Sequence, residues 1–201
     1  MLSFVFVLGS ERFVGHGFSR AKRNGSRRAL APGGAKVAKI PRRVQQAGVY
    51  FVTADTWERH ALFINSQLAN IAVEQIVSCR DRGSYKLHAF ALMPEHLHIL
   101  LTPSDETSIE RAMQMIKGGS SHRIGVEKPQ AFPVWHRSFH DRWIRDAEQF
   151  WQAKSYIEQN PVKAKLVETA EQYAWSSANG KTLLDCSRFE EPAAKAFGKG
   201  V

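Results

Sequence analysis

The stretch YKLHAFALMPEHLHILLT, residues 85–102, carries the clearest prediction of fold in the chain. Its two apolar runs, at 85–93 and 96–102, are typical of β-strands, and Pro94-Glu95 between them is typical of a tight turn. Two strands joined by so short a turn pair antiparallel. The stretch therefore predicts a β-hairpin, around which the segments before and after it can be arranged.

The flanking segments alternate between strand-like and helix-like patterns. Residues 49–54 are β-branched and aromatic, as in a strand, and apolar residues recur at helical spacing over 58–79. Beyond the hairpin we expect a helix over 108–124 loosened at Gly118-Gly119, a strand over 134–144, and a helix from Asp146 to about Asn160, which Pro161 ends. The order β-α-β-β-α-β-α predicts an α+β fold: a ferredoxin-like (split βαβ) antiparallel sheet with helices on one face and an added C-terminal helix that bears Tyr156.

The net charge of +9 is concentrated at one end of the 201 residues. Residues 1–43 hold ten of the 28 Lys and Arg residues but one of the 19 Asp and Glu residues, which leaves 18 of each sign elsewhere. Residues 9–48 also lack any sustained period, as in a disordered segment. We expect a basic, disordered N-terminal arm at 1–46, a folded domain at 47–180 and a weakly structured C-terminal tail at 181–201. The overall charge belongs to the arm and says nothing about the folded domain.

Cysteine content and hydropathy limit the cellular compartments in which the protein is expected. Cys79 and Cys186 lie far apart and match no metal or disulfide spacing, which fits a reducing cytoplasm. The apolar run at 2–8 lacks the preceding positive charge of a secretory signal, and no apolar run approaches the roughly 18 residues of a membrane span. We therefore expect a cytoplasmic protein without a membrane partner. The arm fits either a transit peptide or a start codon assigned too early, and its role stays open.

His96 and His98 are the first candidates for chemistry. Because side chains alternate along a strand, both imidazoles lie on one face of the predicted sheet, away from the core and close enough to share a cation. Leu97, Ile99 and Leu101 take the other face, against the helices. Two structural histidines would fit the same short motif.

The helix predicted to start at Asp146 carries polar residues off its apolar stripe. Phe150 and Ile157 belong to the stripe, whereas Tyr156 lies roughly 100–120° from it. Asn160 follows Tyr156 by one turn and lies on the same side. A solvent-facing tyrosine alone would need no function, but a tyrosine, an amide and paired histidines together favour a catalytic site.

These residues stand in a series of motifs that resembles a known family. HLH after MP (93–98), WHRSFHDRWIRD (135–146), YIEQNPVKAKLV (156–167) and YAWSS (173–177) are similar to the single-tyrosine HUH transposases, and most closely to the REP-associated tyrosine transposases. The resemblance covers about residues 47–180. Glu95 stands where the family often has Asn or Asp, and the basic arm is not part of the family pattern.

The resemblance implies a metal-dependent enzyme that nicks and transfers single-stranded DNA. Carried over by motif, Tyr156 is the nucleophile, and His96, His98 and Asn160 bind Mg²⁺ or Mn²⁺; Glu95 is not expected to be a ligand. Imidazole and amide ligands can hold such an ion, and a nearby cation favours the phenolate that attacks. The family reaction passes through a covalent 5′-phosphotyrosine intermediate and leaves a free 3′-OH.

The resemblance also implies the partners. The substrate is single-stranded or hairpin DNA, at palindromic repeats in a bacterial nucleoid. Strand rejoining needs no nucleotide cofactor, and the chain shows no nucleotide-triphosphate loop. The family includes dimers that place the tyrosine in trans, so both a monomer and a homodimer stay open.

Residues 111–145 are the predicted DNA-binding region, because they hold seven Lys and Arg residues against Glu127 and Asp141. The segment 117–123 (KGGSSHR) can bring backbone amides and cations to a phosphate, although an ordinary solvated helix end has the same composition. Trp135 and Trp143 share a strand face and are expected in the core, with base stacking as the alternative. The DNA-binding candidates are Lys117, Arg123, Arg137, Arg142 and Arg145. His136 and His140 can assist either the metal site or a phosphate, and His88 on the neighbouring strand can support the metal ligands.

Two other functions fit parts of the pattern. A non-catalytic nucleic-acid-binding domain of the same fold, retained by the host, would bind DNA and not cleave it. A metal-dependent hydrolase of the His-x-His type would need a barrel of at least about 200 residues, which is longer than 47–180. The transposase function is therefore preferred, with the binding domain as its alternative.

Overall fold

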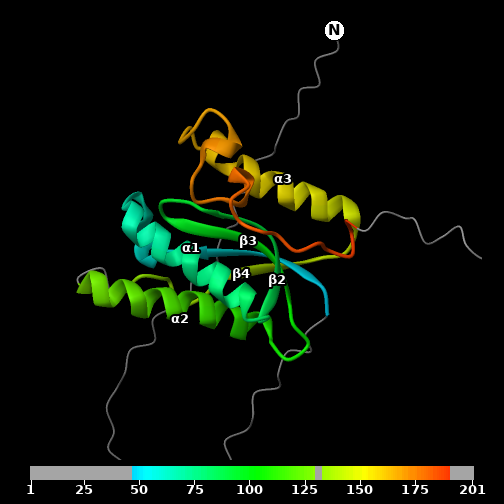
Figure 1. Ribbon diagram of the computed structural model, residues 1–201, viewed down its shortest axis with the longest axis horizontal. Coiled ribbons are helices and arrows are strands. Elements are labelled where there is room, and N and C mark those ends of the chain that lie inside the picture. Colours follow the sequence, from blue (N-terminus) through cyan, green and yellow to red (C-terminus); the bar gives the residue numbers. More distant parts are fainter. Residues whose placement is uncertain (1–46, 130–132, 191–201) are drawn as a thin grey trace, which may run out of the picture. The chain divides into compact units, whose positions relative to one another are not determined.

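The structure, a computed structural model, describes residues 47–129 and 133–190; the basic arm expected at 1–46 and the tail beyond 190 lie outside them. The regular elements are β1 (Val49–Asp55), α1 (Ser66–Asp81), β2 (Tyr85–Leu92), β3 (His96–Pro103), α2 (Ile109–Glu127), β4 (His140–Ile144) and α3 (Ala147–Lys163) (Figure 1). This order confirms the predicted β-α-β-β-α-β-α sequence. None of the helices in these ranges is long and apolar enough to cross a membrane.

The strands form one antiparallel sheet in the order β2-β3-β1-β4. The predicted hairpin is present, with Leu92 paired to Leu97 next to the turn and Tyr85 paired to Pro103 at the far end. This strand order is that of a split βαβ fold and confirms the ferredoxin-like class. It also places β1 in the middle, between the histidine-bearing strand β3 and the exposed strand β4.

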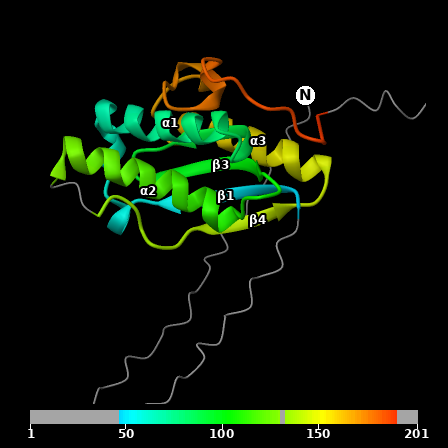
Figure 2. The same cartoon turned by 60° about the horizontal axis from the view of Figure 1, so that its bottom comes forward.

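Helices cover both faces of the sheet (Figures 1 and 2). α1 and α2 pack on one face, in a core that includes Leu97, Ile99 and Leu101 as predicted. α3 packs on the opposite face, where Phe150 and Ile157 join a second apolar cluster. The histidines do lie away from the main core, but their face is partly covered, because the apolar stripe of α3 must also be buried.

The helix expected from Glu58 begins later, at Ser66, where Asn65 caps it by accepting a hydrogen bond from the backbone N–H of Leu68. Two 3₁₀ turns, Trp57–Arg59 and Leu62–Ile64, precede it. Glu58 and Arg59 both have left-handed φ angles, 52° and 54°, which an α-helix excludes. Apolar spacing did not reveal this break, because short 3₁₀ turns repeat at nearly the same interval.

Two other element ends also differ from prediction. The strand expected over 134–144 is regular only in β4, and Trp135 instead forms an isolated bridge with Thr56. α3 continues through Pro161 to Lys163 rather than ending near Asn160. In the last turn of a helix, a proline removes a single backbone hydrogen bond, so the turn survives.

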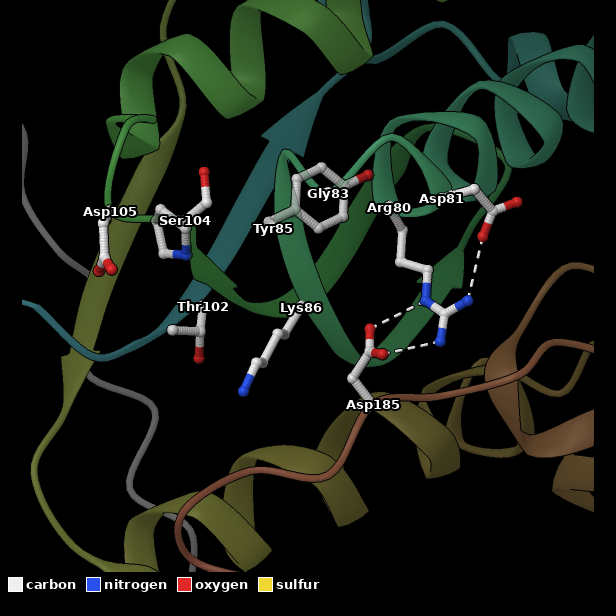
Figure 3. Close-up of a pocket in the computed structure, with 10 residues that line it drawn as sticks. Arg80, Asp81, Gly83, Tyr85, Lys86, Thr102, Ser104, Asp105 and Asp185 are labelled. Carbon is white, nitrogen blue, oxygen red and sulfur yellow. Dashed lines mark hydrogen bonds and ion pairs between the residues drawn. The ribbon is translucent and has the colours of Figure 1, made fainter.

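The C-terminal segment 173–190, called the C-terminal strap below, follows the outer edge of β2. Ser176 forms a bridge with Ala91, and Asp185 N–H donates to the Leu87 carbonyl. The Asp185 carboxylate accepts from the Leu87 N–H and, through two bonds, from the Arg80 guanidinium (Figure 3). An uncovered edge strand can pair with a strand of another protein molecule, and the strap prevents this by covering the edge of β2.

Candidate active site

His96 and His98 lie at the start of β3, on the sheet face that α3 partly covers. Their rings meet edge to face with centroids 4.6 Å apart. Thr53 stands opposite His98 on β1, and its Oγ1 lies 2.9 Å from His98 Nδ1 in a hydrogen bond. Phe51, two residues earlier on the same face, stacks on the His98 ring at 5.5 Å. The predicted pair is therefore held in place by β1.

Burial keeps both imidazoles neutral. His98 is 6% exposed, and desolvation, helped by the charges of His96 and Arg59, lowers its pKa to about 3. Desolvation, with a smaller contribution from Arg59, also lowers the pKa of His96. A neutral imidazole keeps a free lone pair, which is the form that binds a metal ion.

Tyr156 projects from α3 towards the same strands. Its ring meets the ring of His98 edge-on at 5.4 Å and that of Phe51 at 6.0 Å. Lys163 places its Nζ 5.0 Å from the centre of the tyrosine ring. The Tyr156 side chain remains 42% exposed, so a substrate can reach its hydroxyl. The fold thus brings the predicted nucleophile beside a predicted metal ligand.

The donor set around the histidines fits a divalent ion. The Nε2 atoms of His96 and His98 form none of the hydrogen bonds found in the described ranges. Asn160 lies one turn after Tyr156, half-buried, and its side chain forms none of the hydrogen bonds found in the described ranges. Within those ranges no three His, Cys, Asp or Glu side chains form a metal-binding group, so a metal ion on the histidine pair would need donors of another kind to complete its shell. Two neutral imidazoles and an amide oxygen, with waters, can meet that need.

Arg59 holds two carboxylates that flank His96. It pairs with Asp55, opposite His96 on β1, and with Glu95, which precedes His96. The Glu95 Oε1 atom lies 3.9 Å from His96 Nδ1. The left-handed φ angles of Glu58 and Arg59 strain the backbone here, and such strain concentrates at functional sites. The turn after β1 is therefore built around the histidine pair.

The exposed edge of the sheet supplies positive charge next to the tyrosine. His140 and Arg142, on β4, lie on the sheet face that carries the histidines. The Arg142 guanidinium lies 5.7 Å from the centre of the Phe51 ring. Arg137 and Arg145, before and after β4, are exposed as well. Three of the five predicted DNA-binding residues are therefore exposed, and Arg142 lies next to Phe51 of the site.

The other two predicted DNA-binding residues have internal partners. Lys117 Nζ donates to two carbonyls of the segment before β4, those of Arg137 and Ser138, each at 3.0 Å, and burial lowers the pKa of Lys117. Arg123 pairs with Glu74 of α1 and bonds to a carbonyl of the same helix. Both side chains hold elements together, which leaves their predicted role at the DNA without structural support.

Gly119 of α2 has a packing role, whereas a Cβ at Gly118 would meet nothing within 4 Å. α2 is continuous through 118–119, so the backbone amides of 117–123 are used within the helix, and the prediction that they cradle a phosphate is wrong. A Cβ at Gly119 would collide with the Gln75 side chain of α1. Nearby, Trp135 is buried and bonds to Ser120 of α2, and Trp143 packs against the same core. Core packing of both tryptophans is confirmed.

His88 and His136 have contacts other than the predicted metal ligands. Both ring nitrogens of His88 are engaged, with the Asp185 carbonyl and with Thr102 Oγ1, each at 2.8 Å. His88 therefore locks the C-terminal strap to the sheet. His136 is exposed and stacks on Trp57 at 6.3 Å.

A pocket of about 670 Å³ lies at the other end of the β2–β3 hairpin, beside the C-terminal strap. Side chains of both charges line it, among them Arg80, Lys86 and Asp185 (Figure 3). Arg80 is paired with Asp81 and Asp185, and none of the predicted site residues borders the pocket. It is therefore separate from the candidate active site.

Four residues of the site were not predicted from sequence. Lys163 follows Tyr156 by seven residues, which is two helical turns, so spacing could have found it. Phe51 and Thr53 depend on the register of β1 against β3, which the sequence does not reveal. Arg59 depends on the left-handed turn after β1.

Comparison with known proteins agrees with this fold. A solved structure described as a REP-associated tyrosine transposase bound to a REP hairpin matches with a TM-score of 0.57 and 24% identity, over 69% of this chain and 82% of the other. A REP-associated tyrosine transposase of Escherichia coli (strain K12) is 24% identical over 133 residues, 66% of this chain and 77% of that protein. A putative one of Haemophilus influenzae (strain ATCC 51907 / DSM 11121 / KW20 / Rd) is 22% identical over 142 residues, 66% and 80% of the two chains.

The family match covers the site itself. The family model described as Transposase IS200 like matches residues 47–160, which is more than half of the chain. The matched range contains the histidine pair on β3, together with Tyr156 and Asn160 on α3. The chain belongs to the IS200-like transposase family.

Proposed function

We propose that this protein nicks and rejoins single-stranded DNA, with Tyr156 as the nucleophile and with His96, His98 and Asn160 as ligands of Mg²⁺ or Mn²⁺. The observation that carries the proposal is the edge-on contact between the rings of Tyr156 and His98 at 5.4 Å. Because the tyrosine is also exposed, one phosphate can reach the tyrosine hydroxyl and the histidine pair together.

In the proposed reaction the Tyr156 hydroxyl oxygen attacks the phosphorus of a phosphodiester, and the bond from phosphorus to the 3′ oxygen breaks. The phenol gives up its proton and the departing 3′ oxygen takes one up, which leaves a 5′-phosphotyrosine and a free 3′-OH. When bound, the divalent ion polarises the phosphoryl oxygen. One phosphodiester replaces another, so the reverse reaction rejoins strands without ATP.

The side chains around Tyr156 suit this reaction. Lys163 places its Nζ 5.0 Å from the centre of the Tyr156 ring, where the ammonium can bind a phosphate that reaches the tyrosine. His98 and Phe51 contact the ring and limit its rotation. Arg142, on the same face, is exposed and can bind a neighbouring phosphate of the strand.

We infer that the DNA is a hairpin of a palindromic repeat in the bacterial chromosome. A similar solved structure is described as bound to a REP hairpin, and relatives of two bacteria are named REP-associated tyrosine transposases. The exposed side chains of Arg137, Arg142 and Arg145 supply the cations that a phosphate backbone requires.

A labelled hairpin oligonucleotide with single-stranded flanks tests the function. With Mn²⁺ or Mg²⁺, a 3′ label should become attached to protein, and a 5′ label should appear in a shorter, free strand that ends in 3′-OH. EDTA or the substitution His96→Ala should remove both products. Metal-independent binding with no cleavage would instead assign the chain a non-catalytic DNA-binding role.

A further inference from the structure

We propose that Thr53 and Glu95 are positioning residues, which orient His98 and His96 so that both rings present Nε2 to the bound metal ion. This inference rests on the proposed metal-dependent function and adds two residues that lie outside the predicted ligand set. It is drawn from the contacts that surround the Nδ1 atom of each imidazole.

The Nδ1 atom of His98 is occupied by Thr53. The two residues are register partners on neighbouring strands, and Oγ1 lies 2.9 Å from Nδ1. Phe51 stacks on the same ring at 5.5 Å and prevents the ring from turning over freely. Only Nε2 of His98 is therefore left for a ligand.

The Nδ1 atom of His96 is turned inward. It is buried and lacks a hydrogen-bond partner, and the nearest carboxylate oxygen, Glu95 Oε1, is 3.9 Å away. A shift of about 1 Å would bring the two atoms within hydrogen-bond distance. Arg59 already pairs with Glu95 and with Asp55, so the Glu95 carboxylate is held close to the ring and its charge is balanced.

A metal-bound histidine commonly donates its second N–H to a hydroxyl, carbonyl or carboxylate, which sets its tautomer and its direction. Here the Thr53 hydroxyl would accept from His98 Nδ1–H, and the Glu95 carboxylate would accept from His96 Nδ1–H. Both residues would act through the ligands without touching the metal or the DNA.

The test combines two measurements on the full chain: ring tautomers from ¹⁵N-histidine NMR, and the Kd for Mn²⁺ from calorimetry. Thr53→Val should alter the His98 ring signals and weaken Mn²⁺ binding about tenfold, since loss of such an outer contact costs 10- to 100-fold. Thr53→Ser should restore both. Glu95→Ala should weaken Mn²⁺ binding by a similar factor, and Glu95→Gln, which keeps an acceptor, should weaken it less.

The matched control is Thr102→Val. Thr102 makes a Thr–His hydrogen bond of the same kind, to His88 at 2.8 Å, on the same hairpin. It should change the His88 ring signals and leave Mn²⁺ binding unchanged.

Equal weakening of Mn²⁺ binding by Thr53→Val and Thr102→Val would overturn the proposal, as would unchanged Mn²⁺ binding in Thr53→Val or Glu95→Ala. Should the parent bind no Mn²⁺, the proposed metal-dependent function fails. The tautomers still decide the positioning in that case, because a proton on His98 Nε2 contradicts it and a proton on Nδ1 supports it.

Discussion

His98 is packed against Phe51, Thr53 and Tyr156, which leaves its ring 6% exposed. An imidazolium in this place would lose most of its hydration, and the positive charge of Arg59 nearby adds to the penalty. The ring is therefore neutral at physiological pH and can accept a metal ion without first releasing a proton. The same burial makes the folded protein sensitive to acid.

The predicted consequence is a loss of stability as the pH falls below 6.5, the ordinary value for histidine. The folded-state pKa of His98 is about 3, so between pH 3 and 6.5 the unfolded chain binds the extra proton and is favoured. Because His98 stays neutral in the folded protein, the free energy of unfolding should fall by about 1 kcal/mol for each pH unit below 6.5. Denaturant titrations in EDTA at pH 7.5 and 5.0 measure this loss.

The substitution His98→Gln should make that loss smaller than in the parent. His88 and His96 have pKa values lowered in the same direction, so part of the acid sensitivity should remain. An equal loss of stability in the parent and in His98→Gln would show that His98 takes up its proton in the folded protein at ordinary pH.

At the scale of elements, the C-terminal strap and β2 depend on each other. Asp185 joins the strap to β2 through both backbone groups of Leu87 and to α1 through the Arg80 guanidinium, and its carbonyl contacts His88 of β2. The Arg80 side chain is only 17% exposed, so it has little water to replace a lost partner. Asp185 is therefore one of the positions that anchor the strap, with Ser176 at its bridge to Ala91.

We predict that Asp185→Ala lowers the free energy of unfolding by about 1–3 kcal/mol, because it leaves the Leu87 N–H without its acceptor and Arg80 with Asp81 alone. The matched control is Asp81→Ala, which removes the other and more exposed partner of Arg80 and should cost no more than about 0.5 kcal/mol. Both values come from urea unfolding. Equal costs for the two substitutions would mean that the strap adds little to stability.

The kinds of element and their order could be predicted, because long periodic segments and the tight turn in the hairpin are local signals. The residues at which the helices and strands begin and end could not be predicted. The break before α1 depends on two left-handed residues, Glu58 and Arg59, and the end of α3 depends on a proline that the last turn tolerates. The strap carries no periodic pattern, and it binds β2 through single polar contacts that only the fold brings together.

The candidate site could likewise be predicted only in part. His96 and His98 share a face by strand alternation, and Tyr156 and Asn160 share a side by helical spacing, both of which are local rules. That the two sets meet follows from the family resemblance and not from the spacing. The contribution of Thr53 depends on strand register, which only the folded sheet defines.

At the scale of the whole molecule, the charge that contacts DNA is predicted to be the exposed charge beside the tyrosine. Arg142 should bind a phosphate directly, so Arg142→Gln should weaken binding of a single-stranded flank and reduce the salt slope of log K by about 0.7. Arg123→Gln removes the same charge at a position paired internally with Glu74, and it should leave the slope unchanged. Fluorescence anisotropy over a range of salt concentrations makes the comparison. Equal effects would mean that only total charge matters.

The proposed function requires that Tyr156 is the residue that becomes covalently joined to DNA. The most direct measurement is a denaturing gel of the full chain with a 3′-labelled hairpin oligonucleotide in Mn²⁺, followed by mass spectrometry of the labelled peptide. The parent should form a covalent adduct on Tyr156, and Tyr156→Phe should form none while still binding the hairpin. An adduct of undiminished yield in Tyr156→Phe, or one found on another residue, would show that Tyr156 is not the nucleophile.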